Sequence, residues 1–160
     1  MSKQPFYFIA NIGNGSLWMG PRPTSDELHD WASALKDQGV THVVSLIENA
    51  EVERYRLESE GNVLENLDIG FTRFPVDDFN TPDAVKFQQL IADLTARLKQ
   101  NETLFLHCAG GVGRAGTTAS CLLVNHGMDP DDTMTLVSSQ RGEKSPETLE
   151  QEEFVRGFQL

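Results

Sequence analysis

Cysteine is scarce in this chain of 160 residues, which contains only Cys108 and Cys121. The residues around Cys121 predict a helix. A rise of about 1.5 Å per residue over the thirteen positions that separate the two thiols then places them far beyond disulfide reach. We therefore expect two reduced thiols and a cytoplasmic location. The apolar run Cys121–Val124 predicts that Cys121 belongs to the core.

Basic residues are also few, with 13 Lys and Arg against 24 Asp and Glu, a formal net charge of −11. The field of the whole molecule repels nucleic acid and anionic membrane surfaces, so we expect neither as a partner. No apolar run is long enough to span a bilayer, and the first eight residues lack the apolar core and cleavage site of a signal peptide. Repeats, low-complexity tracts and linkers are absent, which predicts a single domain over residues 1–160.

Short apolar runs alternate with amphipathic segments along the chain. The apolar runs predict strands at 6–10, 17–19, 43–47, 71–74 and 103–107. Helical spacing and capping residues predict helices at 24–38, 51–60, 81–99, 114–125, from 129, and 146–158. Strands that alternate with helices build a mostly parallel sheet covered on both faces. The expected fold class is therefore α/β, a single domain with a central, mostly parallel sheet flanked by helices.

The most informative segment is a glycine-rich loop between the strand at 103–107 and the helix at 114–125. It reads His107-Cys108-Ala109-Gly110-Gly111-Val112-Gly113-Arg114. Glycine tolerates the positive φ values that turn backbone N–H groups inward around an anion, and the following helix directs its positive end to the same point. These donors would stabilise a thiolate at Cys108, while Arg114 can hold two phosphate oxygens at once. The predicted phosphate-binding residues are Ala109, Gly110, Gly111, Val112, Gly113 and Arg114.

Two other phosphate-loop motifs overlap this segment. Gly111 to Gly116 spells G-x-G-x-x-G, but a dinucleotide fold needs a second strand ending in an acidic residue about 20 positions later. Residues 128–132 there indicate a turn and a helix start instead. Gly111 to Thr117 also resembles a nucleotide P-loop, yet it has no lysine in the phosphate-binding position. A buried structural cysteine beside a solvated arginine is the remaining interpretation without function.

The string His-Cys-Ala-Gly-Gly-Val-Gly-Arg-Ala-Gly-Thr at 107–117 closely resembles the signature loop of the protein tyrosine phosphatase superfamily. Within it the chain is most similar to the compact dual-specificity type, which includes cyclin-dependent-kinase-inhibitor-associated and bacterial members. The segments Gly39–Leu46 and Glu147–Gln151 share this resemblance. It implies a cysteine-based phosphatase fold that needs no cofactor, with Cys108 as the nucleophile and Arg114 as a phosphate ligand.

A cysteine that displaces a phosphoester needs an acid to protonate the leaving oxygen. Residues 74–82, Phe-Pro-Val-Asp-Asp-Phe-Asn-Thr-Pro, follow a strand at the sheet edge where α/β sites gather, and 108 − 78 = 30 residues separate Asp78 from the nucleophile. The resembling family has an aspartate on a mobile loop at about this separation, and the flanking prolines align it with Asp78. Asp77 is the alternative acid. Both carboxylates also fit a simple role as helix caps near Thr81 or as a solvated turn.

The resemblance also implies functional roles for the residues at three further positions. It implies that the ring of His107 orders the loop and helps keep the catalytic thiol ionised, although a hydrogen-bonded core position explains a strand-end histidine equally well. Gln151 matches a glutamine that orients water in the second step, although a solvated helix face explains it nearly as well. Ala115 stands where many relatives have Ser or Thr, whose hydroxyl supports departure of the thiolate, so Thr117 or Thr118 would have to substitute.

The sequence predicts a two-step phosphomonoester hydrolase. In it, Cys108 forms a phosphocysteine intermediate and acts on phosphotyrosine, and also on phosphoserine and phosphothreonine, in phosphorylated proteins. Two alternatives stay open. One is a phosphoinositide or inositol-phosphate phosphatase, which the absence of a loop lysine disfavours. The other is a weakly active phosphate-binding regulator, which the intact Cys108, Arg114 and Asp78 argue against and Ala115 keeps open. The other histidines, His29, His42 and His126, are dispersed without ligand spacing, so we expect no metal. The sequence carries no signal for the oligomeric state.

Overall fold

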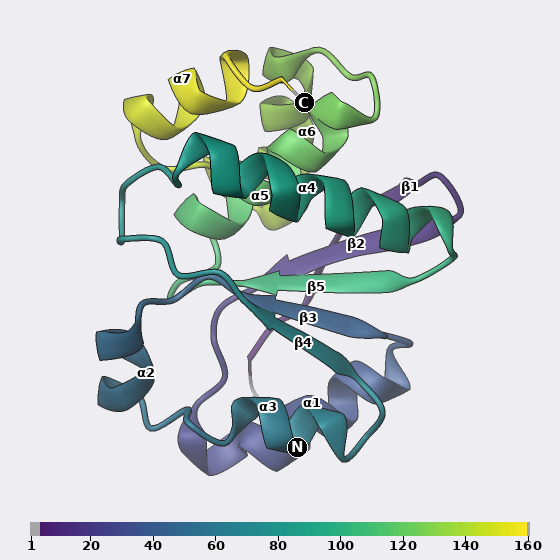
Figure 1. The fold of residues 1–160 in the computed structure, drawn as a ribbon, viewed down its shortest axis with the longest axis vertical. Coiled ribbons are helices and arrows are strands. Elements are labelled where there is room, and N and C mark those ends of the chain that lie inside the picture. Colours follow the sequence, from purple (N-terminus) through teal and green to yellow (C-terminus); the bar gives the residue numbers. More distant parts are fainter. Residues whose placement is uncertain (1–3, 160) are drawn as a thin grey trace.

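The computed structural model describes residues 4–159 and has one five-stranded sheet at its centre (Figure 1). Its strands are β1 (Tyr7–Ile12), β2 (Gly15–Gly20), β3 (His42–Ser45), β4 (Gly70–Arg73) and β5 (Thr103–His107). They lie in the order β1-β2-β5-β3-β4. β1 is antiparallel to β2, while all other neighbours are parallel. The predicted α/β class with a mostly parallel sheet is therefore confirmed.

Helices cover both faces of this sheet. They are α1 (Leu28–Asp37), α2 (Asn49–Arg54), α3 (Glu60–Glu65), α4 (Ala84–Lys99), α5 (Gly113–Asn125), α6 (Pro130–Arg141) and α7 (Leu149–Arg156). Figure 1 shows α4 to α7 on one face, α1 and α3 on the other, and α2 beyond the carboxyl ends of the parallel strands. No helix within residues 4–159 is both long and apolar enough to cross a membrane.

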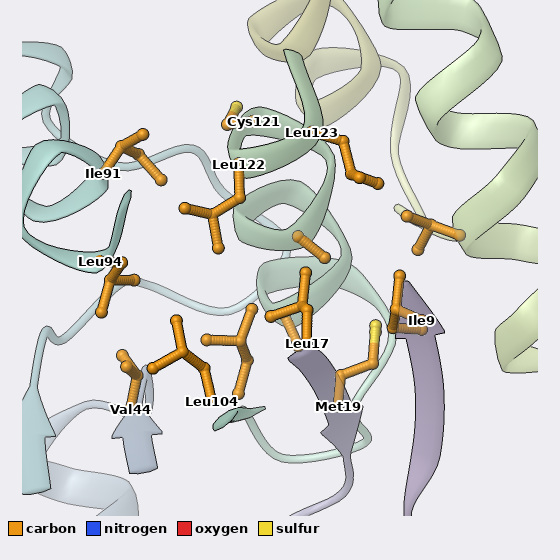
Figure 2. Packing of buried hydrophobic residues seen from close by; sticks show 14 of the residues in the cluster. Ile9, Leu17, Met19, Val44, Ile91, Leu94, Leu104, Cys121, Leu122 and Leu123 are labelled. Atoms are coloured by element: carbon orange, nitrogen blue, oxygen red, sulfur yellow. The ribbon is translucent and has the colours of Figure 1, made fainter. Parts of the chain in front are cut away.

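Two apolar clusters hold these layers together, one on each face. β5 contributes side chains to both clusters, because successive side chains of a strand point to opposite faces. Leu104 and Leu106 pack with α4 and α5, as Figure 2 shows for Leu104 beneath Leu122. Phe105 packs on the other face with Trp31 of α1. Burial of the central strand on both faces fixes its register and therefore the position of the loop that follows it.

The helix predicted over 51–60 is wrong, because two short helices, α2 and α3, stand in its place. α2 ends in a Schellman motif: the N–H of Leu57 donates to Val52 O and that of Arg56 donates to Glu53 O. Arg56 has φ 55°, the left-handed conformation that ends a helix in this motif. Leu57 is thereby turned into the apolar cluster beside Val52.

Three helices begin later than the sequence predicts. Only a short 3₁₀ turn follows Thr24, whose side chain makes no capping hydrogen bond. α4 does not begin at Pro82, because Asp83 caps it by accepting the N–H of its third residue. α7 likewise begins after Pro146, with Thr148 as its cap. In both cases the side-chain acceptor, which satisfies an otherwise unpaired amide, decides the start.

Candidate active site

β5 delivers the predicted nucleophile to the middle of the sheet's carboxyl edge. His107, its last residue, is paired in register with Gly20 of β2 on one side and Ser45 of β3 on the other. Cys108 follows directly and is 3% exposed. Both Cys108 and Cys121 are free thiols. Cys121 lies in the middle of α5 and is fully buried, as predicted, and this burial raises the pKa of its thiol.

The carbonyl groups of the loop are all held from outside. Each carbonyl oxygen of residues 109–112 accepts a hydrogen bond of 2.6 to 3.1 Å from a donor that precedes or follows the loop in the sequence. The donors are the backbone N–H of Arg22, the guanidinium of Arg141 and the hydroxyl of Ser145. By contrast, the amide N–H groups of residues 109–114 donate to no acceptor in the described part of the chain. Six amide donors in one loop are thus available to an anion.

Only one glycine of the loop needs its backbone freedom. Gly111 has φ 72°, and a Cβ there would lie 2.2 Å from the carbonyl carbon of Gly20, so a side chain is excluded twice over. The expectation that Gly110 and Gly113 also adopt positive φ is wrong. At Gly113 a Cβ would lie 2.6 Å from Glu147 Oε1, the end of an exposed side chain that can move aside, and 3.1 Å from Gln151 Nε2. Gly110 has open space around it.

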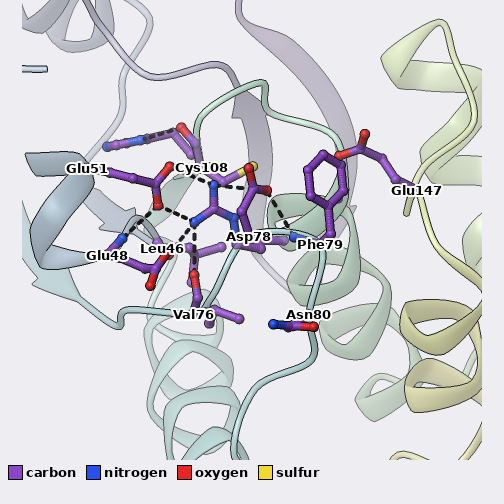
Figure 3. A network of polar contacts seen from close by, with 12 residues as sticks. Leu46, Glu48, Glu51, Val76, Asp78, Phe79, Asn80, Cys108 and Glu147 are labelled. Atoms are coloured by element: carbon purple, nitrogen blue, oxygen red, sulfur yellow. Dashed lines mark hydrogen bonds and ion pairs between the residues drawn. The ribbon is translucent and has the colours of Figure 1, made fainter. Parts of the chain in front are cut away.

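Arg114, at the start of α5, is buried and held by a carboxylate that the sequence did not single out. Its Nη1 and Nη2 donate to Glu51 Oε1 and Oε2 at 2.6 and 3.0 Å, and Nη1 also donates to Val76 O at 2.9 Å (Figure 3). Its Nε has no partner. Because the fork is fixed by Glu51, the unpaired Nε–H remains for a ligand.

Burial disfavours the charge on both members of this pair, but their contact outweighs it. Burial alone would lower the pKa of Arg114, yet the hydrogen bonds to Glu51 and the nearby Cys108 and Asp78 raise it overall. Burial alone would raise the pKa of Glu51, yet the hydrogen bonds from Arg114 and from the Glu48 N–H lower it overall. Both groups therefore stay ionised at neutral pH.

Asp78 lies in contact with the same guanidinium. Its Oδ1 is 3.3 Å from Arg114 Nη2 and accepts the N–H of Phe79 at 3.0 Å (Figure 3). The side chain is 45% exposed, so it is open to a ligand in the loop. Because Asp83 caps α4, the alternative that Asp78 or Asp77 only caps this helix is wrong.

Asp77 lies against a different partner. Its carboxyl group contacts that of Glu48, and this hydrogen bond raises the pKa of Glu48. The N–H of Asp78 also donates to Glu48, which lowers that pKa but is outweighed. Asp77 forms no ion pair with Arg114 within residues 4–159. The two adjacent aspartates thus differ in their neighbours: Asp78 lies beside the arginine, and Asp77 lies beside a carboxyl group.

His107 lies beneath the loop, fully buried. Its Nε2 is 2.6 Å from Oε2 of Glu60, itself 2% exposed, and its Nδ1 is 3.2 Å from the carbonyl oxygen of Cys108. Trp31 packs edge-on against the ring. The ring therefore both has its hydrogen bonds satisfied in the core and contacts the backbone of Cys108.

Gln151 is fully buried, so the alternative of a solvated helix face is wrong. Its Oε1 accepts the N–H groups of Glu147 and Thr148 at 3.0 and 3.1 Å, which completes the cap of α7. Its Nε2 donates to the carbonyl oxygen of Asn80 at 3.3 Å. A Cβ at Gly113 would lie 3.1 Å from the same Nε2, so this amide lies beside the phosphate loop.

The comparison with known proteins identifies the family. The sequence model described as "Swiss Army Knife protein, DSP-PTPase phosphatase domain" matches residues 10–155. The chain belongs to this family. Cyclin-dependent kinase inhibitor 3 of Rattus norvegicus is 26% identical over 126 residues, which are 78% of this chain and 59% of that protein. The phosphatase domain thus spans about three fifths of the length of such curated relatives.

Solved structures of similar shape are also cysteine-based phosphatases. Kinase associated phosphatase, with serine replacing its catalytic-site cysteine, matches with a TM-score of 0.86 at 20% identity over 95% of this chain and 92% of that chain. Tk-PTP in its active form matches with a TM-score of 0.76 at 23% identity, over 94% and 93% of the two chains. The expected cysteine-based phosphatase fold is therefore confirmed.

The resemblance implies a hydroxyl at position 115, where this chain has alanine, and two nearby threonines are the candidates to replace it. Ala115 is fully buried in the first turn of α5. The hydroxyl of Thr117 donates to Gly113 O at 2.8 Å, and that of Thr118 donates to Arg114 O at 2.9 Å. Both protons are committed to the helix backbone, so neither threonine is a free donor to the cysteine sulfur.

Four supporting residues escaped the sequence reasoning: Glu51, Glu60, Arg141 and Ser145. No local motif marks them, because each acts on a loop 30 to 63 residues away in the chain. The one available signal was a mismatch of residue type and position, since Glu51 and Glu60 fall among apolar positions of their segments. Within the described residues, no group of three or more His, Cys, Asp and Glu side chains is placed to hold a metal ion.

Proposed function

We propose that this domain hydrolyses phosphomonoesters, with phosphotyrosine in proteins as its main substrate and phosphoserine and phosphothreonine as further ones. The observation that carries the proposal is the set of unpaired donors around Cys108. Six loop amides and the buried Nε–H of Arg114 lack protein acceptors. A tetrahedral phosphoryl group with three non-bridging oxygens fits such a set, because each oxygen accepts two or more hydrogen bonds.

In the first step the thiolate of Cys108 attacks phosphorus. The S–P bond forms as the bond from phosphorus to the ester oxygen breaks, and Asp78 transfers its proton to that oxygen. Arg114 and the amides of residues 109–114 stabilise the charge on the three equatorial oxygens. The 3.3 Å contact between Asp78 Oδ1 and Arg114 Nη2 supports this assignment, because it brings the acid to the group that holds the phosphate.

In the second step water replaces the thiolate. Asp78, now ionised, takes a proton from the attacking water as the new P–O bond forms and the S–P bond breaks. Inorganic phosphate and the Cys108 thiolate are the products, so atoms and charges balance. We assign Gln151 to orient this water, which its position beside Gly113 supports. His107 supports the loop from below through the Cys108 carbonyl.

The substrate assignment is supported by an apolar rim beside the acid. Phe79 is 55% exposed and has φ 64°, a conformation that a bulky residue adopts rarely. Leu149 is 64% exposed, and its neighbour Thr148 donates to Phe79 O at 3.4 Å. An aryl ring or an apolar peptide side chain would cover this rim. An inositol phosphate would not.

The remaining expectations follow from the same chemistry. A catalytic thiolate survives in a reducing compartment, which supports a cytoplasmic location. The donors around Cys108 all come from the protein, so the proposed reaction needs no cofactor. The loop has no lysine for additional phosphates, which weighs against a polyphosphorylated inositol substrate. A regulator without turnover would have no use for Asp78 in contact with Arg114.

The test compares wild type, Cys108→Ser and the matched thiol control Cys121→Ala. Each is assayed with para-nitrophenyl phosphate, phosphotyrosine and phosphoserine peptides, and inositol phosphates. We expect Cys108→Ser to lose turnover on all of them while calorimetry still detects vanadate binding, and Cys121→Ala to remain active. More than trace activity in Cys108→Ser contradicts the nucleophile assignment. Faster turnover of inositol phosphates than of phosphopeptides contradicts the substrate assignment.

A further inference from the structure

A second arginine lies beside the phosphate loop without a carboxylate partner. Arg22 follows β2, and its backbone N–H donates to Ala109 O, one residue from the nucleophile. Its guanidinium lies 3.5 Å from the centre of the Tyr55 ring. Its only hydrogen bond to protein is from Nη1 to Pro23 O at 3.0 Å. Most of the donors of this guanidinium therefore lack a protein acceptor.

Arg54 approaches the same ring. Its guanidinium carbon is 5.6 Å from the centre of Tyr55, and its side chain is exposed. Among the residues that the structure describes, Arg54 and Arg22 form no ion pair. Two like charges against one ring repel each other unless an anion lies between or beside them. In a chain with 24 acidic and 13 basic residues, it is unexpected that neither arginine forms a direct ion pair, although the charge of Arg54 contributes to the lowered pKa of Glu51.

α2 places this pair of arginines next to the phosphate site. Tyr55 follows Glu51 by four residues, so the two side chains lie on one face of the helix. Glu51 holds Arg114 in the site, and Tyr55 carries Arg22 about one helical turn away. In Figure 3, Glu51 and Phe79 lie on opposite sides of Cys108, so the α2 side is opposite the apolar rim.

We propose that Arg22 and Arg54 bind a second phosphoryl group, carried by the same peptide substrate as the phosphate that is hydrolysed. The proposal rests on the proposed function and deepens it. An extended peptide advances about 3.3 to 3.6 Å per residue, so a phosphorylated residue two or three positions from the reacting one lies about 7 to 11 Å away, between one and two helical turns. Stacking on Tyr55 holds the guanidinium of Arg22 in place, and a pre-ordered arginine binds a phosphate with less loss of side-chain entropy.

The experiment measures the ratio of kcat/KM for two peptides, because effects on the chemical step that both peptides share cancel in this ratio. Two phosphotyrosine peptides of the same sequence are compared, one with a phosphoserine three residues away and one with serine there. We expect wild type to have a kcat/KM about five-fold higher for the doubly phosphorylated peptide, as one partly exposed charge pair supplies. Arg22→Gln and Arg54→Gln should each lower the ratio, and the double variant should bring it close to one. The control Lys99→Gln removes one charge at the far end of α4 and should keep it.

A wild-type ratio near one, or an unchanged ratio in Arg22→Gln, overturns the proposal. So does an equal loss on both peptides, which would assign Arg22 to support of the loop alone. Calorimetry with Cys108→Ser separates this site from the reaction itself. If wild type turns over no phosphopeptide, yet the doubly phosphorylated peptide binds Cys108→Ser more tightly than it binds Cys108→Ser with Arg22→Gln, the second site stands and the proposed function fails. Inositol bisphosphate without a peptide is measured in the same way. If Arg22→Gln weakens its binding to Cys108→Ser as much as it weakens binding of the doubly phosphorylated peptide, the peptide assignment is overturned.

Discussion

The imidazole of His107 is 2.6 Å from the carboxylate of Glu60, and both side chains are buried. The other ring nitrogen faces the carbonyl oxygen of Cys108. Both distances are within hydrogen-bond range, so the ring is held at one end by a buried carboxyl group and at the other by the backbone of Cys108. Glu60 thereby fixes the orientation of the His107 ring against that backbone.

Replacing Glu60 should therefore weaken the nucleophile. In Glu60→Gln an amide replaces the carboxyl group, so the short contact with His107 is weakened and the ring is held less firmly against the Cys108 carbonyl. We expect iodoacetamide to alkylate Cys108 several-fold more slowly at neutral pH, with a parallel drop in kcat. Glu65→Gln changes an exposed residue of the same helix and should leave the rate alone. Equal alkylation rates in Glu60→Gln and wild type would show that Glu60 has only a structural role.

The two aspartates of the acid loop should differ sharply. Asp78→Asn removes the proton donor and should slow turnover by about 10² to 10⁴-fold, with loss of the basic limb of the pH-rate profile. Asp77→Asn should cost less than about ten-fold, because Asp77 contacts Glu48 and not Arg114. Full pH-rate profiles of both variants decide the assignment. A reversed order of effects would make Asp77 the acid.

The buried Ala115 predicts a slow second step. The hydroxyls of Thr117 and Thr118 are committed to backbone carbonyls, so the departing thiolate lacks a hydroxyl donor from these residues. Rapid-quench kinetics should show a burst followed by a slower steady state. Ala115→Ser adds one donor, and a hydrogen bond to a charged group contributes roughly 1.5 to 3 kcal/mol, or about ten-fold or more in rate. The steady-state rate should rise and the burst should shrink. No burst in wild type, with no gain in Ala115→Ser, would contradict this account.

His42 should make stability depend on pH. Burial, with a contribution from Arg97 that Glu102 partly offsets, lowers its pKa from 6.5 to about 4. Between these two pH values the unfolded chain binds a proton at His42 that the folded chain does not bind. The free energy of unfolding therefore falls as the pH drops from about 6.5 to about 4. The loss attributable to this residue is about 2 to 3 kcal/mol. Urea unfolding of wild type and His42→Gln measures it. The variant should lose less stability between pH 7 and pH 4, and parallel curves would contradict the prediction.

The sequence by itself determined the parts of this protein whose chemistry is local. The run from His107 to Arg114 carries the proposed nucleophile, the glycines and the arginine within eight residues, so no tertiary information is needed to recognise it. The strands were predictable because burial on both faces of a sheet demands continuous apolar runs, as in β5. The loop with Asp77 and Asp78 was also recognisable, but its spacing did not separate the two carboxylates.

Only the tertiary structure decided how that loop is held and which neighbours the two carboxylates have. Placing β5 between β2 and β3 brings segments distant in the chain to one sheet edge, where Glu51 reaches Arg114 and Glu60 reaches His107. Such contacts leave no periodic or local trace, because a buried ion pair is defined by geometry across the sheet rather than by spacing along it. The same holds for Asp78, which differs from Asp77 only in its neighbour. A buried arginine on one side and a carboxyl group on the other give two identical residues different chemistry.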